Sequence, residues 1–407
     1  MSLPPNEPLT GKQVVLGVTG GIAAYKAADF TSKLVQLGAD VHVVLTDGAR
    51  EFIQPMTFQA LTRNPVYSSV FDGWSGDDAG HVTLAARADV VIVAPGTANS
   101  IARMANGFAD DMLGAILLAT QAPLILAPAM EHHMWHHRAT QANLQLLRER
   151  GVRVVEPESG RLASGASGDG RLASVERILY ATRCVLGASG PLQGKKVVVT
   201  AGGTHEAIDP VRFIGNGSSG TMGIALALAA ADSGADVTLI VGPAVANPPV
   251  GMNVLRITSA LELQAAVGEA IEDVDVLIMA AAVSDFRPES ATAEKVKKTD
   301  GEDHWNIRLV KNPDILATTE REGLIKIGFA AETNDLLANA QNKLERKGLE
   351  MIIANDAVAT IGSANSAATI ITRGNPVPDT LPEMSKTSLA GEIIARIAGL
   401  VLNQESD

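Results

Sequence analysis

The chain of 407 residues is long enough to form two or three domains with separate hydrophobic cores. Thirty-three lysines and arginines stand against 45 aspartates and glutamates, the net charge is −12, and only 3% of the residues are aromatic. This balance argues against a nucleic-acid-binding protein, because such proteins neutralise phosphates with basic residues and stack bases on aromatic rings.

The single cysteine, Cys184, excludes an intramolecular disulfide and suits a reducing compartment. No charged segment leads into an apolar run at the N-terminus, so we expect no signal peptide. Gln121 and Pro123 interrupt the most apolar stretch, residues 112–130, which favours a buried helix, a turn and a buried strand over a membrane span. We therefore expect a soluble, cytoplasmic protein.

The same opening occurs twice, as GKQVVLGVTGG at residues 11–21 and as GKKVVVTAGGT at residues 194–204. Each is a β-branched run that ends in a glycine-rich turn, which indicates a buried parallel strand. Helical patterns follow, and in each half a glycine is expected to stop the helix just before the next strand. The corresponding second and third strands are expected within residues 37–46, 233–242, 88–99 and 274–285.

This alternation predicts two doubly wound, Rossmann-like α/β domains with mainly parallel sheets. A segment rich in turn-forming residues, 187–195, separates them, so we expect domains at 1–190 and 191–407. Apolar residues at helical spacing within 384–402 predict a final amphipathic helix. Ligands are expected at the carboxyl ends of the strands.

In the first half, Gly17, Gly20 and Gly21 lie where the first strand meets the first helix, and backbone N–H groups there can hold a phosphate. A tight turn alone would also require glycine, and the spacing is not the usual dinucleotide fingerprint. His81 precedes an apolar pattern; taken alone, it would be a surface residue or a helix cap.

The run EHHMWHH contains two histidine pairs at i, i+4 spacing, His132 with His136 and His133 with His137. Such pairs can bind a metal ion when they lie on a helix, although a histidine-rich helix start is the simpler interpretation. The sequence alone therefore assigns no metal ligand.

In the second half, residues 201–223 contain two glycine-rich turns, with Asn216, Ser218 and Ser219 before a helix start. These donors suit a triphosphate or an acyl phosphate, whereas two unrelated turns would explain only the glycines. The polar stretch 294–298, EKVKK, could close over phosphates or be a solvated surface.

The motifs GVTGGIAAYK, HVTLAARAD, APGTAN and PAM followed by MW resemble those of flavin-dependent cysteine decarboxylases, in particular phosphopantothenoylcysteine decarboxylases. This resemblance implies a flavodoxin-like first domain that binds FMN, with His81 as the catalytic base. The implied flavin contacts are Gly20, Gly21, Ile22, Thr46, Thr97 and Asn99.

Two positions depart from the family pattern. Glu131 stands where the family has asparagine, and Ser164, in the glycine-rich flap 160–172, stands where it has a proton-donating cysteine. Because a hydroxyl is a far weaker acid than a thiol, the proton would have to come from elsewhere. The candidates are a histidine within 132–137 or Glu131, if burial and the negative substrate hold its carboxyl protonated.

The second half, with KNPDIL, GFAAET and IIAND, resembles phosphopantothenate–cysteine ligases, and the whole chain resembles the bacterial bifunctional family of coenzyme A biosynthesis. The resemblance implies 4′-phosphopantothenate, cysteine and CTP as substrates, Mg²⁺ with CTP, and a homo-oligomer of decarboxylase trimers and ligase dimers, up to a dodecamer. Lys295 would stabilise the transferring phosphate, and Asn216 would serve the cysteine-dependent step. The implied CTP contacts, besides Lys295, are Ala281, Asp285, Asn312, Pro313, Asp314, Ile315, Phe329, Lys343 and Lys347.

Two alternatives remain open. One is a ligase whose decarboxylase half has become a flavin-binding scaffold, and the other is a regulatory flavoprotein. The intact His81 and the complete ligase motifs both argue against the regulatory protein.

Overall fold

The computed structural model describes residues 9–71, 80–163, 165–297, 304–332, 336–356, 363, 365–375 and 377–404. The chain forms two compact units, divided between Leu186 and Gly187. The elements of the first unit are β1 (Gln13–Val18), α1 (Ala24–Gln36), β2 (Asp40–Leu45), α2 (Asp47–Arg50), α3 (Pro55–Thr62), β3 (Val66–Tyr67), α4 (Gly80–Arg87), β4 (Val90–Gly96), α5 (Ala98–Asn106), α6 (Met112–Ala119), β5 (Leu124–Pro128), α7 (His132–His136), α8 (Arg138–Glu149), β6 (Arg153–Val154), β7 (Glu158–Arg161), β8 (Ser167–Arg171) and α9 (Val175–Gly187).

The first unit is built on a sheet of order β3-β2-β1-β4-β5-β6, in which all neighbouring strands are parallel. Helices α1, α3 and α9 contribute to the core on one face of this sheet, and α4, α5, α6 and α8 to the core on the other. The strand order reverses between β1 and β4, so the loops that follow these two strands diverge and leave room for a ligand.

The elements of the second unit are β9 (Lys196–Ala201), β10 (His205–Ala207), β11 (Phe213–Gly215), α10 (Thr221–Asp232), β12 (Asp236–Val241), β13 (Asn253–Arg256), α11 (Ala260–Ala270), β14 (Val276–Met279), β15 (Phe286–Pro288), β16 (Leu309–Lys311), α12 (Ile315–Thr318), β17 (Ile325–Glu332), α13 (Leu336–Arg346), β18 (Met351–Asp356), β19 (Asn365–Thr372), β20 (Asp379–Ser385) and α15 (Lys386–Gln404). The main sheet has the order β13-β12-β9-β14-β17-β18-β19-β20. It is parallel except at β18–β19 and β19–β20, and its order reverses between β9 and β14.

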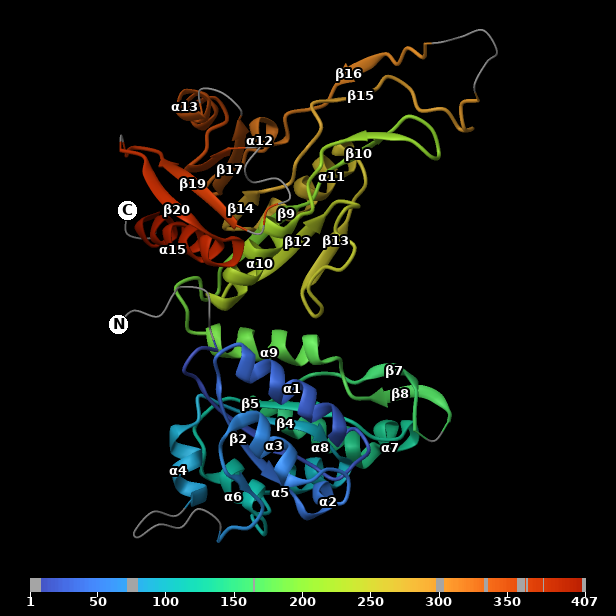
Figure 1. Ribbon diagram of the computed structural model, residues 1–407, viewed down its shortest axis with the longest axis vertical. Coiled ribbons are helices and arrows are strands. Elements are labelled where there is room, and N and C mark those ends of the chain that lie inside the picture. The colour runs from blue at the N-terminus through green and yellow to red at the C-terminus, as the bar shows by residue number, and fades with distance from the viewer. Residues whose placement is uncertain are drawn as a thin grey trace. The chain divides into compact units, whose positions relative to one another are not determined.

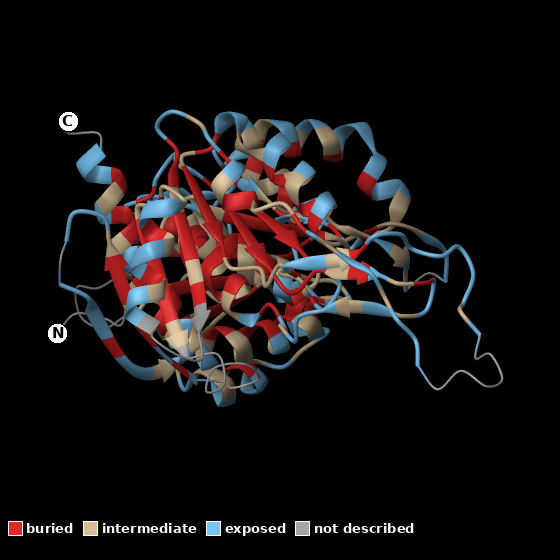
Figure 2. Cartoon of the chain, turned by 90° about the horizontal axis from the view of Figure 1, so that it is seen from above, coloured by how far each residue is buried: buried red, intermediate tan, exposed pale blue. Residues whose placement is uncertain are grey.

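The strands of both main sheets are mostly buried, whereas the helices that cover them expose their outer surfaces (Figure 2). In the second unit, α10 packs against α15 and covers β9 and β12, while α11, α12 and α13 contribute to the core that contains Val198 and Leu277. Doubly wound, mainly parallel sheets are therefore confirmed in both halves. The expected helix and strand within residues 112–130 are α6 and β5, and none of the helices described is long and apolar enough to cross a membrane.

Glycine ends the first helix of each unit, as the sequence predicts. Gly38 and Gly234 have φ values of 85° and 92°, a backbone conformation that other residues rarely adopt. The following N–H groups, of Ala39 and Ala235, donate back to Leu34 O and Ala230 O at 3.1 Å, which closes each helix. The next strand begins two residues after the glycine in both halves.

In both sheets, an aspartate just before one central strand binds the start of the neighbouring strand, β1 or β9. Asp89, before β4, accepts the Gln13 N–H at 2.8 Å and pairs with Lys12 at 2.9 Å. Asp275, before β14, accepts the Lys196 N–H at 2.7 Å and lies 3.8 Å from Lys195. We call this pair of contacts the amino-edge clasp, because it joins the amino ends of the strands.

Two candidate active sites

A cavity of about 1100 Å³ opens at the carboxyl ends of β1 and β4, the place where the strand order reverses. Its volume exceeds that of a typical pocket for one small molecule, roughly 300–1000 Å³, so it can hold a cofactor together with a substrate. Seven residues predicted from the sequence line it: Gly20, Gly21, Ile22, Thr46, Thr97, Asn99 and Glu131.

Close backbone packing shapes the cavity wall formed by the turn after β1. A side chain on Gly20 would put its Cβ 2.6 Å from the carbonyl carbon of Gly48, so only glycine fits. The buried hydroxyl of Thr19 donates to Pro95 O at 2.7 Å and accepts the Thr97 N–H at 3.0 Å, which joins the loops after β1 and β4. Sequence reasoning missed Thr19, although it lies inside the quoted GVTGG motif.

Two threonines on the cavity wall cap helices. Thr46 accepts the Ala49 N–H and Thr97 accepts the Ser100 N–H, each at 3.3 Å, which positions the starts of α2 and α5 beside the cavity. The free N–H groups of the nine-residue helix α5 carry partial positive charge that suits a phosphate.

Basic side chains also line this cavity. Lys26 on α1 and Arg171 on β8 both line the cavity. The pKa of Lys26 is lowered, first by burial of its ammonium group and second by the nearby positive charge of Arg171. Two like charges held together on a cavity wall favour binding of an anion between them. Arg103 is different, because its guanidinium already pairs with Asp110 and Asp111.

The contacts of Glu131 in this structure favour its ionised form. Its carboxylate is bonded to the His133 ring at 3.0 Å and accepts the His133 N–H at 2.7 Å, capping α7. The hydrogen bond to His133 is the main cause of a pKa lower than the usual value of a glutamate. An ionised carboxylate has no proton to donate, so Glu131 as proton donor stays a prediction that depends on the bound negative substrate.

The expected glycine-rich flap is an antiparallel hairpin, β7–β8, whose strands border the cavity. The Met130 N–H donates to Gly170 O at 2.9 Å, and a Cβ on Gly170 would lie only 2.2 Å from Met130 O. The hairpin therefore packs closely against the segment before α7. Ser164, which stands at the position of the family's proton-donating cysteine, lies outside the described residues.

His81, the predicted base, does not line the cavity of its own chain. It lies on α4, and its buried Nδ1 has no hydrogen-bond partner within the described part of the chain. A buried ring nitrogen without a partner is uncommon and favours a functional explanation over a purely structural one.

The second candidate site lies at the carboxyl ends of β9 and β14, again where the strand order reverses. Gly203 forms a bridge to Ala282, and a Cβ on Gly203 would lie 2.6 Å from Asn216 O. The Asn216 amide donates to Ala282 O at 3.3 Å and to Val283 O at 3.1 Å. The structure thus brings Asn216 beside the segment that contains Ala281.

Asn312 links that segment to the next predicted motif. Its buried amide donates to Ser284 O at 2.8 Å, its side-chain oxygen accepts Arg287 Nη1 at 3.0 Å, and its N–H donates to Asp285 O at 2.8 Å. These bonds make Asn312 a residue that positions Asp285. Ile315 is also buried, within the hydrophobic core.

Two predicted nucleotide contacts form an ion pair with each other. Lys347, just after α13, lies 2.9 Å from Asp314 Oδ1, and Asp314 also accepts the Ala317 N–H and caps α12. Burial opposes ionisation of Asp314, but the hydrogen bond and charge of Lys347 outweigh it and lower the pKa of the carboxyl. Lys343 lies one turn earlier on α13. Phe329 is half-buried on β17, where it pairs with Ile353 of β18.

Lys295 is exposed, and the segment that carries it is held by a residue that sequence reasoning missed. The buried carboxylate of Asp209 accepts the N–H groups of Val211 and Arg212 at 2.8 Å and that of Val296 at 3.3 Å. Arg212 bonds the same carboxylate and donates to Val296 O at 2.6 Å. An aspartate followed by proline is a turn signal that could have identified Asp209.

Residues 2–186 match the family Flavoprotein, and residues 192–400 match DFP, described as the DNA/pantothenate metabolism flavoprotein C-terminal domain. The fold and the two sites thus define a flavoprotein of pantothenate metabolism with two domains.

Three relatives align with almost the entire chain, all described as coenzyme A biosynthesis bifunctional protein CoaBC. The protein of Vibrio vulnificus strain YJ016 is 44% identical over 97% of this chain and 99% of its own length. The protein of Vibrio cholerae is 45% identical over 95% and 98%, and that of Bacillus subtilis 43% identical over 96% and 98%. The chain therefore belongs to the coenzyme A biosynthesis bifunctional family, as its motifs implied.

Proposed function

We propose that the second unit joins cysteine to 4′-phosphopantothenate with CTP, and that the first unit decarboxylates the product to 4′-phosphopantetheine with FMN. In the first reaction the substrate carboxylate displaces pyrophosphate from CTP, and the cysteine amine then displaces CMP from the acyl-cytidylate. The observation that carries the proposal is that all six predicted flavin contacts line a single cavity where the strand order reverses.

The residues of this cavity fit FMN by shape and by chemistry. The Gly20–Gly21 turn and the start of α5 offer backbone N–H groups for its phosphate, and Ile22 and Met130 offer apolar surface for its ring. Bound FMN would supply a reversible two-electron acceptor for the cysteine side chain, so that carbon dioxide can leave and the electrons return to the product. The protein would contribute binding, orientation and proton transfer.

Lys26 and Arg171 would bind the phosphate of the substrate on the same cavity wall. An anion between them removes their mutual repulsion, and the pKa of Lys26 then returns toward its usual value. Because Arg171 belongs to the β7–β8 hairpin, phosphate binding also holds this hairpin against the cavity.

In the second unit, Lys295 would stabilise the charge that develops on the transferring phosphate, and Asn216 would act in the cysteine-dependent step. Ala281, Asp285, Pro313, Phe329 and Lys343 would contact CTP. We infer that Asn312, Asp314, Ile315 and Lys347 act mainly by shaping this site, because their side chains are buried or already paired. Mg²⁺ would accompany the triphosphate, whose oxygen atoms are the ligands that this ion prefers.

We infer that His81 serves the cavity of a neighbouring copy, since it does not line its own and a homo-oligomer is expected. The test mixes two inactive variants, His81→Asn and one with a damaged flavin turn, Gly20→Val. Recovered carbon dioxide release in the mixed oligomer supports action across copies. No recovery, with both variants folded and associated, assigns any role of His81 to its own chain. Mass photometry gives the size of the assembly.

The proposal as a whole is tested by measuring pyrophosphate release and carbon dioxide release separately on the pure full-length protein. We expect both, with CTP-dependent pyrophosphate release that EDTA abolishes, and a yellow protein whose absorbance is that of bound FMN. Pyrophosphate release without carbon dioxide would support the ligase with an inactive first half. Flavin binding without either reaction would support the regulatory flavoprotein.

A further inference from the structure

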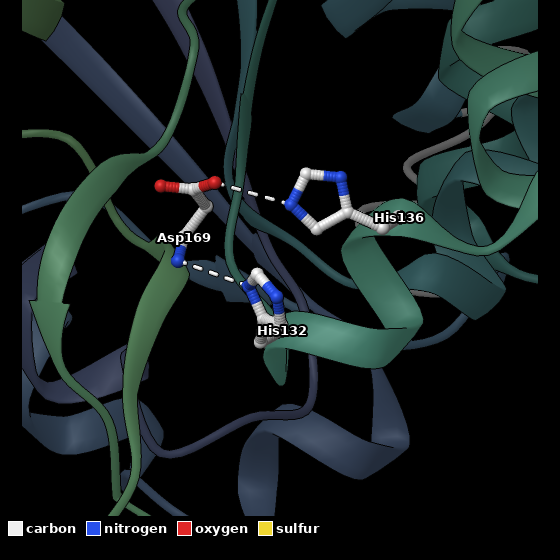
Figure 3. Close-up of side chains that lie close together, drawn as sticks. All are labelled: His132, His136 and Asp169. Carbon is white, nitrogen blue, oxygen red and sulfur yellow. Dashed lines mark hydrogen bonds and ion pairs between the residues drawn. The ribbon is translucent and has the colours of Figure 1, made fainter.

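Three side chains that can each supply a metal ligand gather where α7 meets the β7–β8 hairpin (Figure 3). His132 and His136 lie one turn apart on α7, and Asp169 lies on β8. One nitrogen of each histidine and one carboxylate oxygen of Asp169 lie within 4.8 Å of one another. Asp169 is 33 residues from His136 in the chain, so the fold and not the sequence spacing supplies this third group.

Without an ion, hydrogen bonds join the three groups. His136 Nε2 lies 3.1 Å from Asp169 Oδ2. The Asp169 N–H donates to His132 Nδ1 at 3.2 Å, so this lone pair is engaged by the backbone (Figure 3). A metal ion bound here would replace this hydrogen bond and the proton that His136 Nε2 donates to the carboxylate. The hydroxyl of Ser159 bonds Asp169 Oδ1 and orients the carboxylate, as residues behind a metal ligand commonly do.

We propose that His132, His136 and Asp169 bind a divalent transition-metal ion of the Zn²⁺ type. Two imidazoles and one carboxylate are a common donor set for Zn²⁺ and its neighbours, whereas Mg²⁺ and Ca²⁺ prefer oxygen ligands alone. Ligands about 2.1 Å from an ion lie no more than about 4.2 Å apart, so the set closes through small side-chain rotations. His136 and Asp169 are partly exposed, which gives the ion a path from solvent and leaves positions for water.

The other histidine pair of the same run does not form a site. His133 bonds Glu131, and His137 lies beyond the end of α7, where it caps α8 by accepting the Ala139 N–H at 3.2 Å. Both pairs have i, i+4 spacing in the sequence, but only His132 and His136 lie together on one helix.

The bound ion would tie the hairpin to α7 beside the proposed flavin cavity. Gly170 and Arg171, the residues after Asp169, line that cavity, as do Glu131 and Met134 on the side of α7. The ion would therefore set how firmly the hairpin covers the cavity. This inference is independent of the proposed reactions, because metal binding is measured directly.

The test titrates the full-length protein with Co²⁺, which reports four- or five-coordinate sites by an intense visible absorption band. We expect one such ion per chain, displaced by Zn²⁺ and not by millimolar Mg²⁺. The variants His136→Gln and Asp169→Asn each remove one ligand, and binding should weaken at least about tenfold in both. His137→Asn is the matched control, because it removes a neighbouring histidine while asparagine still caps α8.

A second measurement follows hydrogen exchange of the β7–β8 hairpin with and without Zn²⁺. Slower exchange of the hairpin when Zn²⁺ is added to the wild type, and no such slowing in Asp169→Asn, would support the site. Because each protein is compared with itself with and without Zn²⁺, a change in the local fold of a variant does not obscure the result. An equal loss of Co²⁺ binding in His137→Asn and His136→Gln would mean adventitious binding to exposed histidines and would overturn the proposal. The absence of the Co²⁺ band in the wild type would overturn it as well.

Discussion

The carboxylate of Asp209 lies within hydrogen-bond distance of the backbone N–H of Val296, 87 residues later in the chain. Arg212 completes the link from the other side, by donating to Val296 O and by lying over the Trp305 ring, with its guanidinium carbon 4.5 Å from the ring centre. The segment that carries Lys295 is thus anchored to the glycine-rich motif of residues 201–223. Catalysis by Lys295 should depend on this anchor.

Replacing Lys295 itself tests its proposed role. We expect Lys295→Gln to lower CTP-dependent pyrophosphate release by about 10²–10³-fold, since a charge that stabilises the transition state is lost. The side chain is exposed, so the stability of the fold should hardly change. The exposed Lys297, changed to Gln, is the control, and near wild-type release by Lys295→Gln would contradict the assignment.

Replacing Asp209 should weaken the same reaction without touching a substrate. In Asp209→Asn the bond with Arg212 loses its charge, and we expect pyrophosphate release to fall about tenfold through a lower kcat. Flavin content, a property of the first unit, should not change. Asp379→Asn, which removes a partly exposed carboxylate paired with Arg396 in the same unit, is the control. An unchanged kcat in Asp209→Asn would show that the anchor does not act on Lys295.

The same carboxylate predicts how stability depends on pH. Burial disfavours ionisation of Asp209, but the hydrogen bonds from Val211, Arg212 and Val296 outweigh it and lower the pKa from 3.8 to about 2. A carboxyl group with a lowered pKa stabilises the fold above its unfolded pKa, and this contribution is lost as the pH falls from about 4 to 2. The difference in urea midpoint between wild type and Asp209→Asn should therefore be constant from pH 7 to 5 and shrink below pH 4. A difference that grows in acid would contradict this.

Thr19 should matter for flavin binding. Thr19→Val keeps the side-chain volume but leaves the Thr97 N–H and Pro95 O without their buried partner, at a cost of about 1–3 kcal/mol for each unsatisfied group. The loops after β1 and β4 should then separate, and the purified protein should retain less FMN, as read from its absorbance. Thr31→Val is the control, because among the residues that the structure describes that buried hydroxyl bonds only Ala27 O, within α1. Equal FMN content in the two variants would exclude a positioning role for Thr19.

Lys26 should determine the affinity for the phosphorylated substrate. Loss of one charge-assisted contact costs about 1.5–3 kcal/mol, so Lys26→Met should raise the KM for decarboxylation about 10–100-fold. The CTP-dependent reaction of the second unit serves as the internal control and should keep its rate. A KM for decarboxylation that does not move would mean that the phosphate binds elsewhere.

The sheets, and the gathering of the six predicted flavin contacts at one cavity, could be predicted because they follow from local patterns. Each of these patterns spans only a few consecutive residues: a β-branched run, a helix-ending glycine such as Gly38 or Gly234, or a motif after β1 or β4. The link between Asp209 and Val296, the pair of Asp314 with Lys347 and the approach of Asp169 to His136 join distant segments. Such pairings depend on how loops pack, which periodicity does not encode. The resemblance to a family likewise names His81 but does not say which cavity it serves.

The amino-edge clasp contributes to stability at a place that is distant from the residues proposed to bind substrate. Asp89 with Lys12 and Asp275 with Lys195 secure each sheet at the end opposite to its proposed site. Substitutions that tighten these clasps can raise thermal tolerance without altering the residues that bind substrate. The protein therefore offers an engineer two matching places, one in each half, where robustness can be adjusted independently of turnover.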